Sequence, residues 1–318
     1  MFAASEMRRI HSIGAVVVAI SGAALIGAAP SCSAVTSPPD GGVASCTNIV
    51  GDRQTQVCLR WKCDRGDRRE LWSGSLAACV PGDNLFSRSN ALRMVNLYRF
   101  LAQLPEVASD PGRDAKAQRC ALMMNANLQL NHTPPTTWTC YSADGAEAAG
   151  MSNLASTGGV EAVDLYMVDA QDTAALGHRR WLLSPSLGPV GLGSTSEYSC
   201  LWVGGGSGTA VKPWVAWPPP GPFPVEALLP ATNAGSLNEA GWSIQSDTID
   251  FSKATVDVSE GVTHLPVTPS PLDNDFGSVF AIAFTPLGWS PQPGHRYDVR
   301  VTGVSPEIGY SVDVVNCL

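Results

Sequence analysis

The sequence predicts an α+β fold in which helices come first and short strands follow. Apolar residues recur at helical spacing between residues 89 and 183, and they alternate with polar residues after residue 190. Glycine and proline are frequent, at 31 and 24 of 318 residues, which is typical of many turns between short strands. A helical part followed by a meander of strands indicates an α/β/α or α+β sandwich.

Four helices are predicted from apolar positions at a period of 3.6 and from the residues that stop them. They cover residues 89–104, 114–130, 159–170 and 178–183. Pro105, Pro134 and Pro185 follow three of these segments, and each forbids the helix from continuing. Within the last segment, the large apolar side chain of Trp181 is expected to lie in the core.

The strands are predicted from runs with a period of two. Two such runs lie within residues 190–203, the glycines at 204–208 predict a turn, and residues 214–217 are the expected returning strand. The prolines at 218–220 mark a domain boundary. Beyond it the runs are short, alternating and separated by turns, so we expect strands only, in an all-β immunoglobulin-like sandwich over residues 218–318.

The first 34 residues predict a signal peptide. Arg8 and Arg9 precede an apolar run of small residues from 13 to 29, whose length suits a cleaved signal better than a membrane span. Small residues before Cys32 make it a candidate for lipidation, and cleavage after Ala34 is the alternative. Either outcome predicts a secreted or cell-envelope protein, with an outer-membrane lipoprotein as one form. Residues 35–45, rich in proline, glycine and serine, are expected to be a tether.

The cysteines predict disulfides rather than a metal site. Of nine cysteines, eight remain once Cys32 is removed or lipidated, and an even number in an exported chain implies four disulfides. A zinc site is the alternative for the first four of these eight cysteines, but their spacing lacks paired C-x2-C motifs. Proximity predicts that the cysteines of the Cys-rich segment at 46–87 pair among themselves, Cys120 with Cys140 and Cys200 with Cys317. We expect the arginines of that segment to be solvated. The eight residues are Cys46, Cys58, Cys63, Cys79, Cys120, Cys140, Cys200 and Cys317.

The charge balance excludes some classes of partner. The chain carries 20 basic and 28 acidic residues, a net charge of −8, and it has no basic run. We therefore expect no nucleic-acid partner, and membrane contact only through a lipid anchor at Cys32. We also expect a monomer.

Five blocks in one order carry a resemblance to a known family. They are Val95–Arg99, Asn131-His132, Ser152–Ala155, Gly177–Pro185 and Val190–Gly193. Together they resemble the CAP superfamily (cysteine-rich secretory proteins, antigen 5, pathogenesis-related 1; also called SCP-like), and most closely its bacterial extracellular branch. The resemblance covers about residues 88–217 and implies an α/β/α sandwich with a cleft.

The resemblance also implies a His/Glu/His/Glu tetrad in that cleft, which binds a divalent metal in some members. The histidines fall on His132 and His178, and the first glutamate falls on Ser152. The second glutamate has no matching block, and Glu147 and Glu161 are the nearby candidates. Two imidazoles and a hydroxyl are weaker zinc ligands than a set with a carboxylate. We therefore expect no required cofactor, with a divalent metal such as zinc held by His132 and His178 as the alternative.

The leading functional hypothesis is non-enzymatic binding of a small apolar ligand, a peptide or a cell-envelope component. The candidate ligand-binding residues are His132, Ser152, His178 and Arg179. His178 could instead cap a loop, and either Arg179 or Arg180 could brace a loop carboxylate such as Asp169 or Asp172. A metal-assisted hydrolase, either a protease or an amidase, is the alternative, with His132 and His178 as candidate catalytic residues. A third possibility is an adhesion or scaffold role for the sandwich.

The sequence disfavours a serine hydrolase. His132 and Ser152 with Asp144 or Glu147 have the residue types of a Ser-His-acid set. No G-x-S-x-G elbow surrounds Ser152, however, and such triads are defined by geometry rather than by sequence spacing.

Overall fold

The computed structural model describes residues 49–231 and 234–318 of the chain, which belong to one compact unit. The predicted signal peptide and tether, with Cys32 and Cys46, lie outside the described residues. No helix in the described ranges is both long enough and apolar enough to cross a membrane.

The four predicted helices are present, and three more α-helices were missed. The helices are α1 (Arg53–Asp64), α2 (Leu85–Leu101), α3 (Pro111–Asn127), α4 (Ala143–Met151), α5 (Gly159–Val168), α6 (Gly177–Leu182), the 3-10 helix η1 (Val225–Leu228) and α7 (Leu237–Ala240). The prediction of strands only beyond residue 218 is therefore wrong. A capping box in which Ser236 and Glu239 each bond the other's backbone explains the short helix α7.

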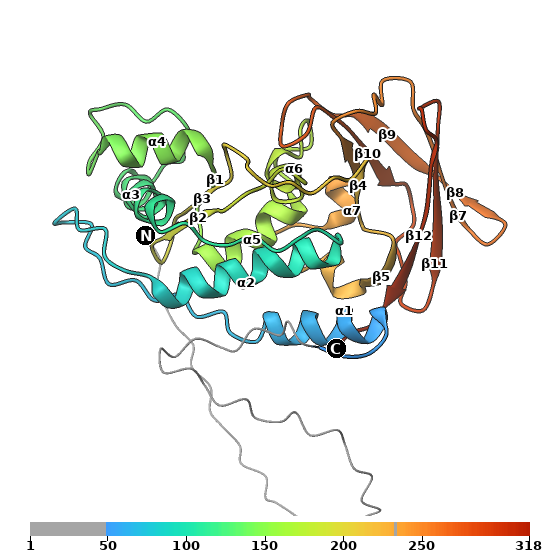
Figure 1. Ribbon diagram of the computed structural model, residues 1–318, viewed down its shortest axis with the longest axis horizontal. Helices are drawn as coiled ribbons and strands as arrows, with labels where there is room; N and C mark the ends of the chain where they lie inside the picture. The colour runs from blue at the N-terminus through green and yellow to red at the C-terminus, as the bar shows by residue number, and fades with distance from the viewer. Residues whose placement is uncertain (1–48, 232–233) are drawn as a thin grey trace, which may run out of the picture. The chain divides into compact units, whose positions relative to one another are not determined.

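Three antiparallel strands form the middle layer of the N-terminal part (Figure 1). They are β1 (Ser152–Ala155), β2 (Gly191–Ser194) and β3 (Ser199–Trp202), in the order β1-β3-β2. Cys200 and Trp202 of β3 join an apolar cluster with α3 and α4, whereas Leu201 between them joins the core that contains α2 and α5. Alternate side chains of a strand point to opposite faces, so helices cover both faces of this sheet.

One glycine is needed where α3 crosses that sheet. A Cβ on Gly193 would lie 2.1 Å from the carbonyl carbon of Ala117, so only glycine allows this approach.

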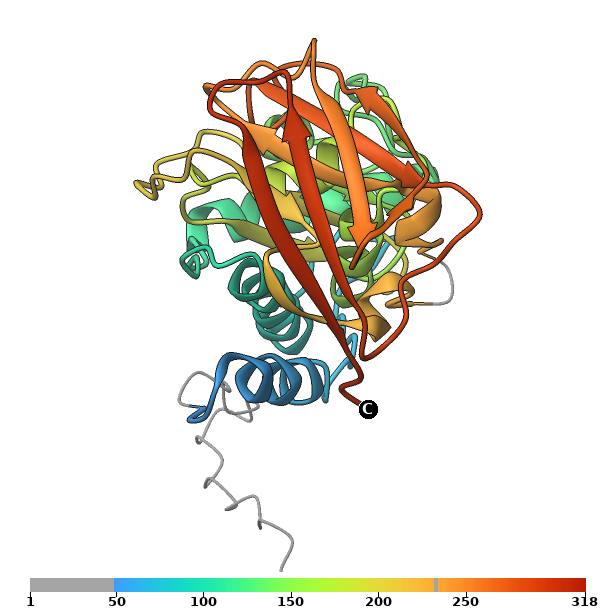
Figure 2. The ribbon, with the colours of Figure 1, turned by 90° about the vertical axis from the view of Figure 1, so that its right-hand side faces the viewer.

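Two further sheets follow, and they confirm a β-rich C-terminal part. One has the order β4-β6-β10-β9, and the other has the order β5-β12-β11-β7-β8, in which β11 and β12 are the long red strands of Figure 2. Their strands are β4 (Val215–Trp217), β5 (Gly221–Pro224), β6 (Trp242–Ser246), β7 (Thr255–Glu260), β8 (Thr263–Leu265), β9 (Val267–Pro271), β10 (Phe280–Pro286), β11 (Arg296–Thr302) and β12 (Ile308–Val315).

The strand predicted at 214–217 exists but has a different partner. It was expected to return beside residues 201–203, whereas β4 pairs antiparallel with β6 of the C-terminal part. The reason is burial: Val215 and Trp217 pack with Trp242 and Ile244 in the large core that runs from α1 and α2 into both C-terminal sheets.

The four-stranded sheet lies between the N-terminal helices and the five-stranded sheet. On β6, Trp242 and Ile244 belong to the core shared with the five-stranded sheet. Ser243 and Gln245 point the other way, and both are hydrogen-bonded to residues of α6. The same alternation on β10 places Ala281 and Ala283 in a cluster with Val168 of α5.

Two adjacent arginines of α6 connect these layers. Arg179 and Arg180 are completely buried, and their guanidinium groups bond backbone carbonyls and serine hydroxyls rather than carboxylates. Burial lowers the pKa of each guanidinium to about 10. The prediction that Arg179 binds a ligand is corrected, because every hydrogen bond of its guanidinium in the structure is internal. Of the predicted contacts between Arg179 and Asp169 or Asp172, the structure has only a hydrogen bond of 3.3 Å from the backbone N–H of Arg179 to Asp169 Oδ2.

The disulfides form, but between other cysteines than sequence proximity predicted. Every cysteine in the described residues is disulfide-bonded. The pairs recorded are Cys58–Cys317, Cys79–Cys140 and Cys120–Cys200. They contradict the predicted pairs Cys120–Cys140 and Cys200–Cys317, and also the predicted pairing of Cys58 and Cys79 within the Cys-rich segment. Packing is the cause: α3 lies on β3, so Cys120 meets Cys200, and α1 lies on β5 beside the end of β12.

Four arginines of the Cys-rich segment are partly or fully buried, contrary to the expectation of a solvated face, whereas Arg69 is exposed as expected. Arg65 and Arg68 both pair with the fully buried carboxylate of Asp164, at 2.7 and 2.9 Å, and the hydroxyl of Tyr98 donates to the same carboxylate. Arg60, also buried, pairs with Asp64 one helical turn later. Ion pairs with Asp164 therefore attach this segment to α5, and hydrogen bonds from Arg93 attach it to α2.

We expect Arg179→Met to lower the free energy of unfolding by about 3 kcal/mol, because the carbonyls of Met167, Val168 and Gly241 would lose buried donors. Arg296→Met is the matched control, since that side chain is 63% exposed and its ion pairs are worth about 0–1 kcal/mol. Urea denaturation of both variants measures the difference. Equal losses would show that the buried network adds no stability.

Candidate functional site

A cavity of about 430 Å³ lies where the end of α4, strand β1 and the start of α6 meet. It brings together both predicted histidines and Ser152, which lie far apart in the sequence. Its lining combines hydrogen-bonding groups with apolar side chains. The polar residues are His132, Ser152, Asn153, Asp172 and His178, and the large apolar ones are Met151, Trp181, Val203 and Phe276.

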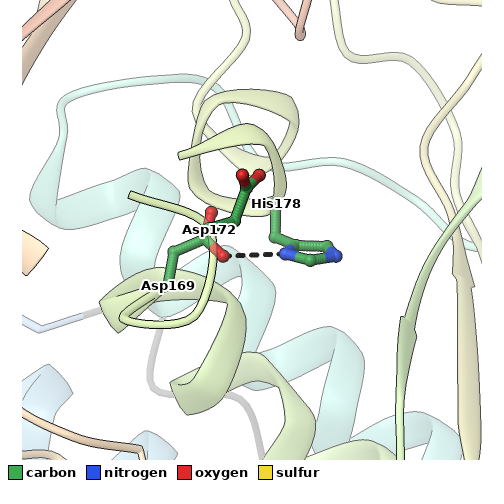
Figure 3. A group of neighbouring side chains, drawn as sticks. All are labelled: Asp169, Asp172 and His178. Carbon is green, nitrogen blue, oxygen red and sulfur yellow. Dashed lines mark hydrogen bonds and ion pairs between the residues drawn. The ribbon is translucent and has the colours of Figure 1, made fainter. Parts of the chain in front are cut away.

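A tight loop before α6 positions His178. Asp169 and Leu176 both adopt left-handed backbone conformations, with φ of 56° and 47°. Asp172 Oδ2 accepts a hydrogen bond of 3.0 Å from the N–H of Gly177, the first residue of α6. Asp169 Oδ1 lies 2.7 Å from His178 Nδ1 (Figure 3). The loop therefore holds two carboxylates beside one imidazole.

The surroundings of His178 favour its protonated form. Burial alone would lower the pKa of this imidazole, but the hydrogen bond to Asp169 and the charges of Asp169 and Asp172 outweigh it, so the pKa lies above its usual value. Because folding raises the pKa, the stabilisation is full below about pH 6.5 and is lost as the pH rises through the folded-state pKa. The ring of Tyr166 stacks on the imidazole at a centroid distance of 5.3 Å.

His132 lies in the loop after α3 and is held in a similar way. Its Nδ1 lies 2.8 Å from the backbone carbonyl of Ala149, which can only accept, so Nδ1 carries the hydrogen. In both histidines an oxygen atom therefore fixes Nδ1, and Nε2 is left to interact with a ligand. Figure 3 shows this second nitrogen of His178 pointing away from Asp169.

Strand β1 supplies the polar residues between the two histidines. Ser152 is buried, and its hydroxyl has no hydrogen-bond partner among the residues that the structure describes. Asn153 donates a hydrogen bond of 3.0 Å to the backbone carbonyl of His178, so β1 is tied directly to α6.

The structure contradicts the Ser-His-acid set. The hydroxyl of Ser152 bonds to neither histidine. Asp144 lies 3.7 Å from Arg119, and Glu147 bonds Lys116 at 2.6 Å, so neither acid supports His132. A nucleophilic triad needs these groups hydrogen-bonded in series.

The acidic partners of the site come from another loop than expected. Glu161 accepts a hydrogen bond from Thr157 in a second cavity, of about 330 Å³, which His178 also borders. Ligand atoms of Asp169, Asp172 and His178 lie within 4.8 Å of one another. This donor set, two carboxylates and an imidazole, fits a divalent cation such as zinc. The site therefore contains carboxylates even though Ser152 stands where the family pattern has a glutamate.

Three contributors to the cavity were missed from the sequence. Trp181 was expected in the core, but it is only partly buried and lines the cavity. Asp172 was considered only as a partner for an arginine, although its position five residues before Gly177 could have signalled it. Phe276 had no local signal, because it lies 98 residues beyond His178 in the chain.

Asp169→Asn should lower the pKa of His178, because the amide can still accept a hydrogen bond but carries no charge to stabilise the imidazolium. An NMR titration of the imidazole proton resonances measures this pKa. Asp257→Asn is the control, since it alters an exposed His264 with the same 2.7 Å contact and should leave His178 unchanged. An unchanged pKa of His178 in Asp169→Asn would contradict this account.

A family model and a solved structure each match part of this chain. Residues 92–203 match the model of the CAP family, described as the cysteine-rich secretory protein family. Among solved structures, an extracellular protein containing an SCP domain from Bacillus anthracis str. Ames is 21% identical, with a TM-score of 0.30. That match covers 36% of this chain and 39% of the other, so it spans less than half of either protein. No curated protein matches. Residues 92–203 of this chain are therefore a domain of the CAP family.

Proposed function

We propose that this chain is an exported protein that binds a small, largely apolar ligand in the cavity around His132 and His178, without catalysing a reaction. The observation that carries the proposal is the cavity itself. Its volume of about 430 Å³ lies in the range of small-molecule sites, and it combines apolar walls with a few convergent polar groups.

The polar groups define what the ligand must offer. Nε2 of His132 and of His178 is available, and the buried hydroxyl of Ser152 has no partner among the described residues. A buried polar group without a partner is costly, so a ligand that bonds Ser152 gains affinity. The ligand is accordingly an apolar molecule with one or two hydrogen-bonding atoms. A peptide side chain or an envelope lipid would meet these requirements.

Export and the character of the C-terminal part belong to the same proposal. The disulfides support an oxidising compartment, as expected outside the cytoplasm. The signal at residues 1–34, lipidation of Cys32 and a monomeric state are part of it. So is an immunoglobulin-like arrangement of the two C-terminal sheets.

The alternative is a metal-assisted hydrolase, and one observation favours it. Asp169, Asp172 and His178 offer three ligand atoms for a cation, which would supply Lewis-acid chemistry when bound. His178 Nδ1 already bonds Asp169, so a cation at this nitrogen would replace that hydrogen bond. A cation at Nε2 would leave Asp169 to orient the ring.

Filling the cavity should abolish ligand binding. Gly150 lines the cavity from the last turn of α4, and a Cβ there would meet only the carbonyl of His132, at 3.6 Å, so Gly150→Leu is tolerated by the backbone. We expect the neutral fluorophore N-phenyl-1-naphthylamine to bind the wild type and to lose at least about tenfold in affinity in the variant, which blocks apolar contact area.

The control for that titration is Gly309→Leu, at an exposed position of β12 where a Cβ has open space. It should bind as the wild type does. Failure of the wild type to bind the probe, or equal binding by Gly150→Leu, contradicts the proposed function.

Zinc titration separates the two functions. If the hydrolase alternative holds, calorimetry will show one zinc ion per chain, lost in His178→Ala and retained in His264→Ala, which removes an exposed His–Asp pair of equal length. The binding function predicts no stoichiometric zinc in any of the three proteins. Stoichiometric zinc binding that depends on His178 would contradict the binding function and favour the hydrolase.

A further inference from the structure

We propose that the loop between β9 and β10, residues 272–279, forms one wall of the ligand cavity, and that Phe276 at its tip contacts the ligand. This inference rests on the proposed binding function. It assigns a ligand-binding residue outside the CAP domain, because the family model ends at residue 203. The C-terminal part would then help to determine which ligands fit.

The loop is fixed to the CAP domain by a buried arginine. Arg180 of α6 donates to the backbone carbonyls of Asp273 and Ser278, at 2.5 and 2.8 Å, and to the Ser278 hydroxyl at 3.2 Å. The N–H of Asp273 donates to the carbonyl of Ala174, at 3.0 Å, in the loop before α6. Both ends of the segment are therefore attached to the elements that position His178.

The backbone between these attachments brings the aromatic ring against α6. Asp275 and Gly277, on either side of Phe276, have φ of 67° and 69°. A Cβ on Gly277 would lie 2.6 Å from the backbone of Arg180, so this close approach requires glycine. A Cβ on Gly177 would lie 2.9 Å from the ring of Phe276. Two glycines thus allow Phe276 to lie directly over the start of α6.

The ring of Phe276 is positioned for contact with a ligand rather than for core packing. It is 39% exposed, yet it lines the same cavity as Trp181 and His178. The guanidinium of Arg180 lies 5.9 Å from its centroid, which helps to hold the ring in place. A large aromatic side chain that is fixed but not covered offers apolar area at little entropic cost. The ligand class this favours is a neutral molecule with a compact or planar apolar group.

Truncation of the ring tests the inference in the full-length exported chain. We expect Phe276→Ala to weaken binding of N-phenyl-1-naphthylamine about five- to tenfold, because about half of a phenylalanine's apolar area is lost from the site. The affinity of Phe276→Leu for the probe should lie between those of the wild type and Phe276→Ala. This variant decides the result if Phe276→Ala alters the thermal unfolding curve. Val279→Ala, an exposed apolar residue of the same loop that does not line the cavity, should bind as the wild type does.

The outcomes separate this inference from the proposed function. If Gly150→Leu abolishes probe binding but both Phe276 variants bind as tightly as the wild type, the cavity binds ligand without this wall and the inference is wrong. If Val279→Ala weakens binding as much as Phe276→Ala, the loss comes from the loop as a whole, and the inference also fails. If the wild type does not bind the probe, both proposals are contradicted.

Discussion

The paired, completely buried guanidinium groups of Arg179 and Arg180 are the constraint on which the site depends. Burying two cations without a carboxylate is costly, and the structure offsets the cost by surrounding each with carbonyl and hydroxyl oxygens from several elements. Those oxygens come from the end of α5, from β6 and the residue just before it, and from the 272–279 loop. His178 immediately precedes the pair on α6. Its position relative to Asp169 is therefore fixed by contacts that reach into the C-terminal sheets.

This arrangement explains why the two parts of the chain share a site. The four-stranded sheet contacts α6 through Ser243 and Gln245, and the loop leading into β10 carries Phe276 over the cavity. On the opposite side, Asn153 connects β1 to the backbone of His178. The histidine thus lies between a strand of the CAP domain and a loop of the β-rich part. A ligand in the cavity would contact both.

What could be predicted from the sequence was what local patterns encode. Helical periodicity located α2, α3, α5 and α6, and the order of motifs placed His132 and His178 near each other, as the cavity lining now shows. Features that depend on long-range packing could not be predicted. Cys120 is nearer in sequence to Cys140 but nearer in space to Cys200, because α3 lies on β3. The partner of β4 and the approach of Phe276 are decided in the same way, by which surfaces bury each other. Asp169 and Asp172 were visible in the sequence, but their role depends on two left-handed residues that no periodicity reveals.

The central claim is that the cavity between His178 and Phe276 binds an apolar ligand with hydrogen-bonding atoms. A crystal structure of the protein with N-phenyl-1-naphthylamine tests it most directly. We expect density for the probe against Trp181 and Phe276, with its N–H directed at Nε2 of His132 or at the hydroxyl of Ser152. Density for the probe at another surface, with this cavity empty, would contradict the claim.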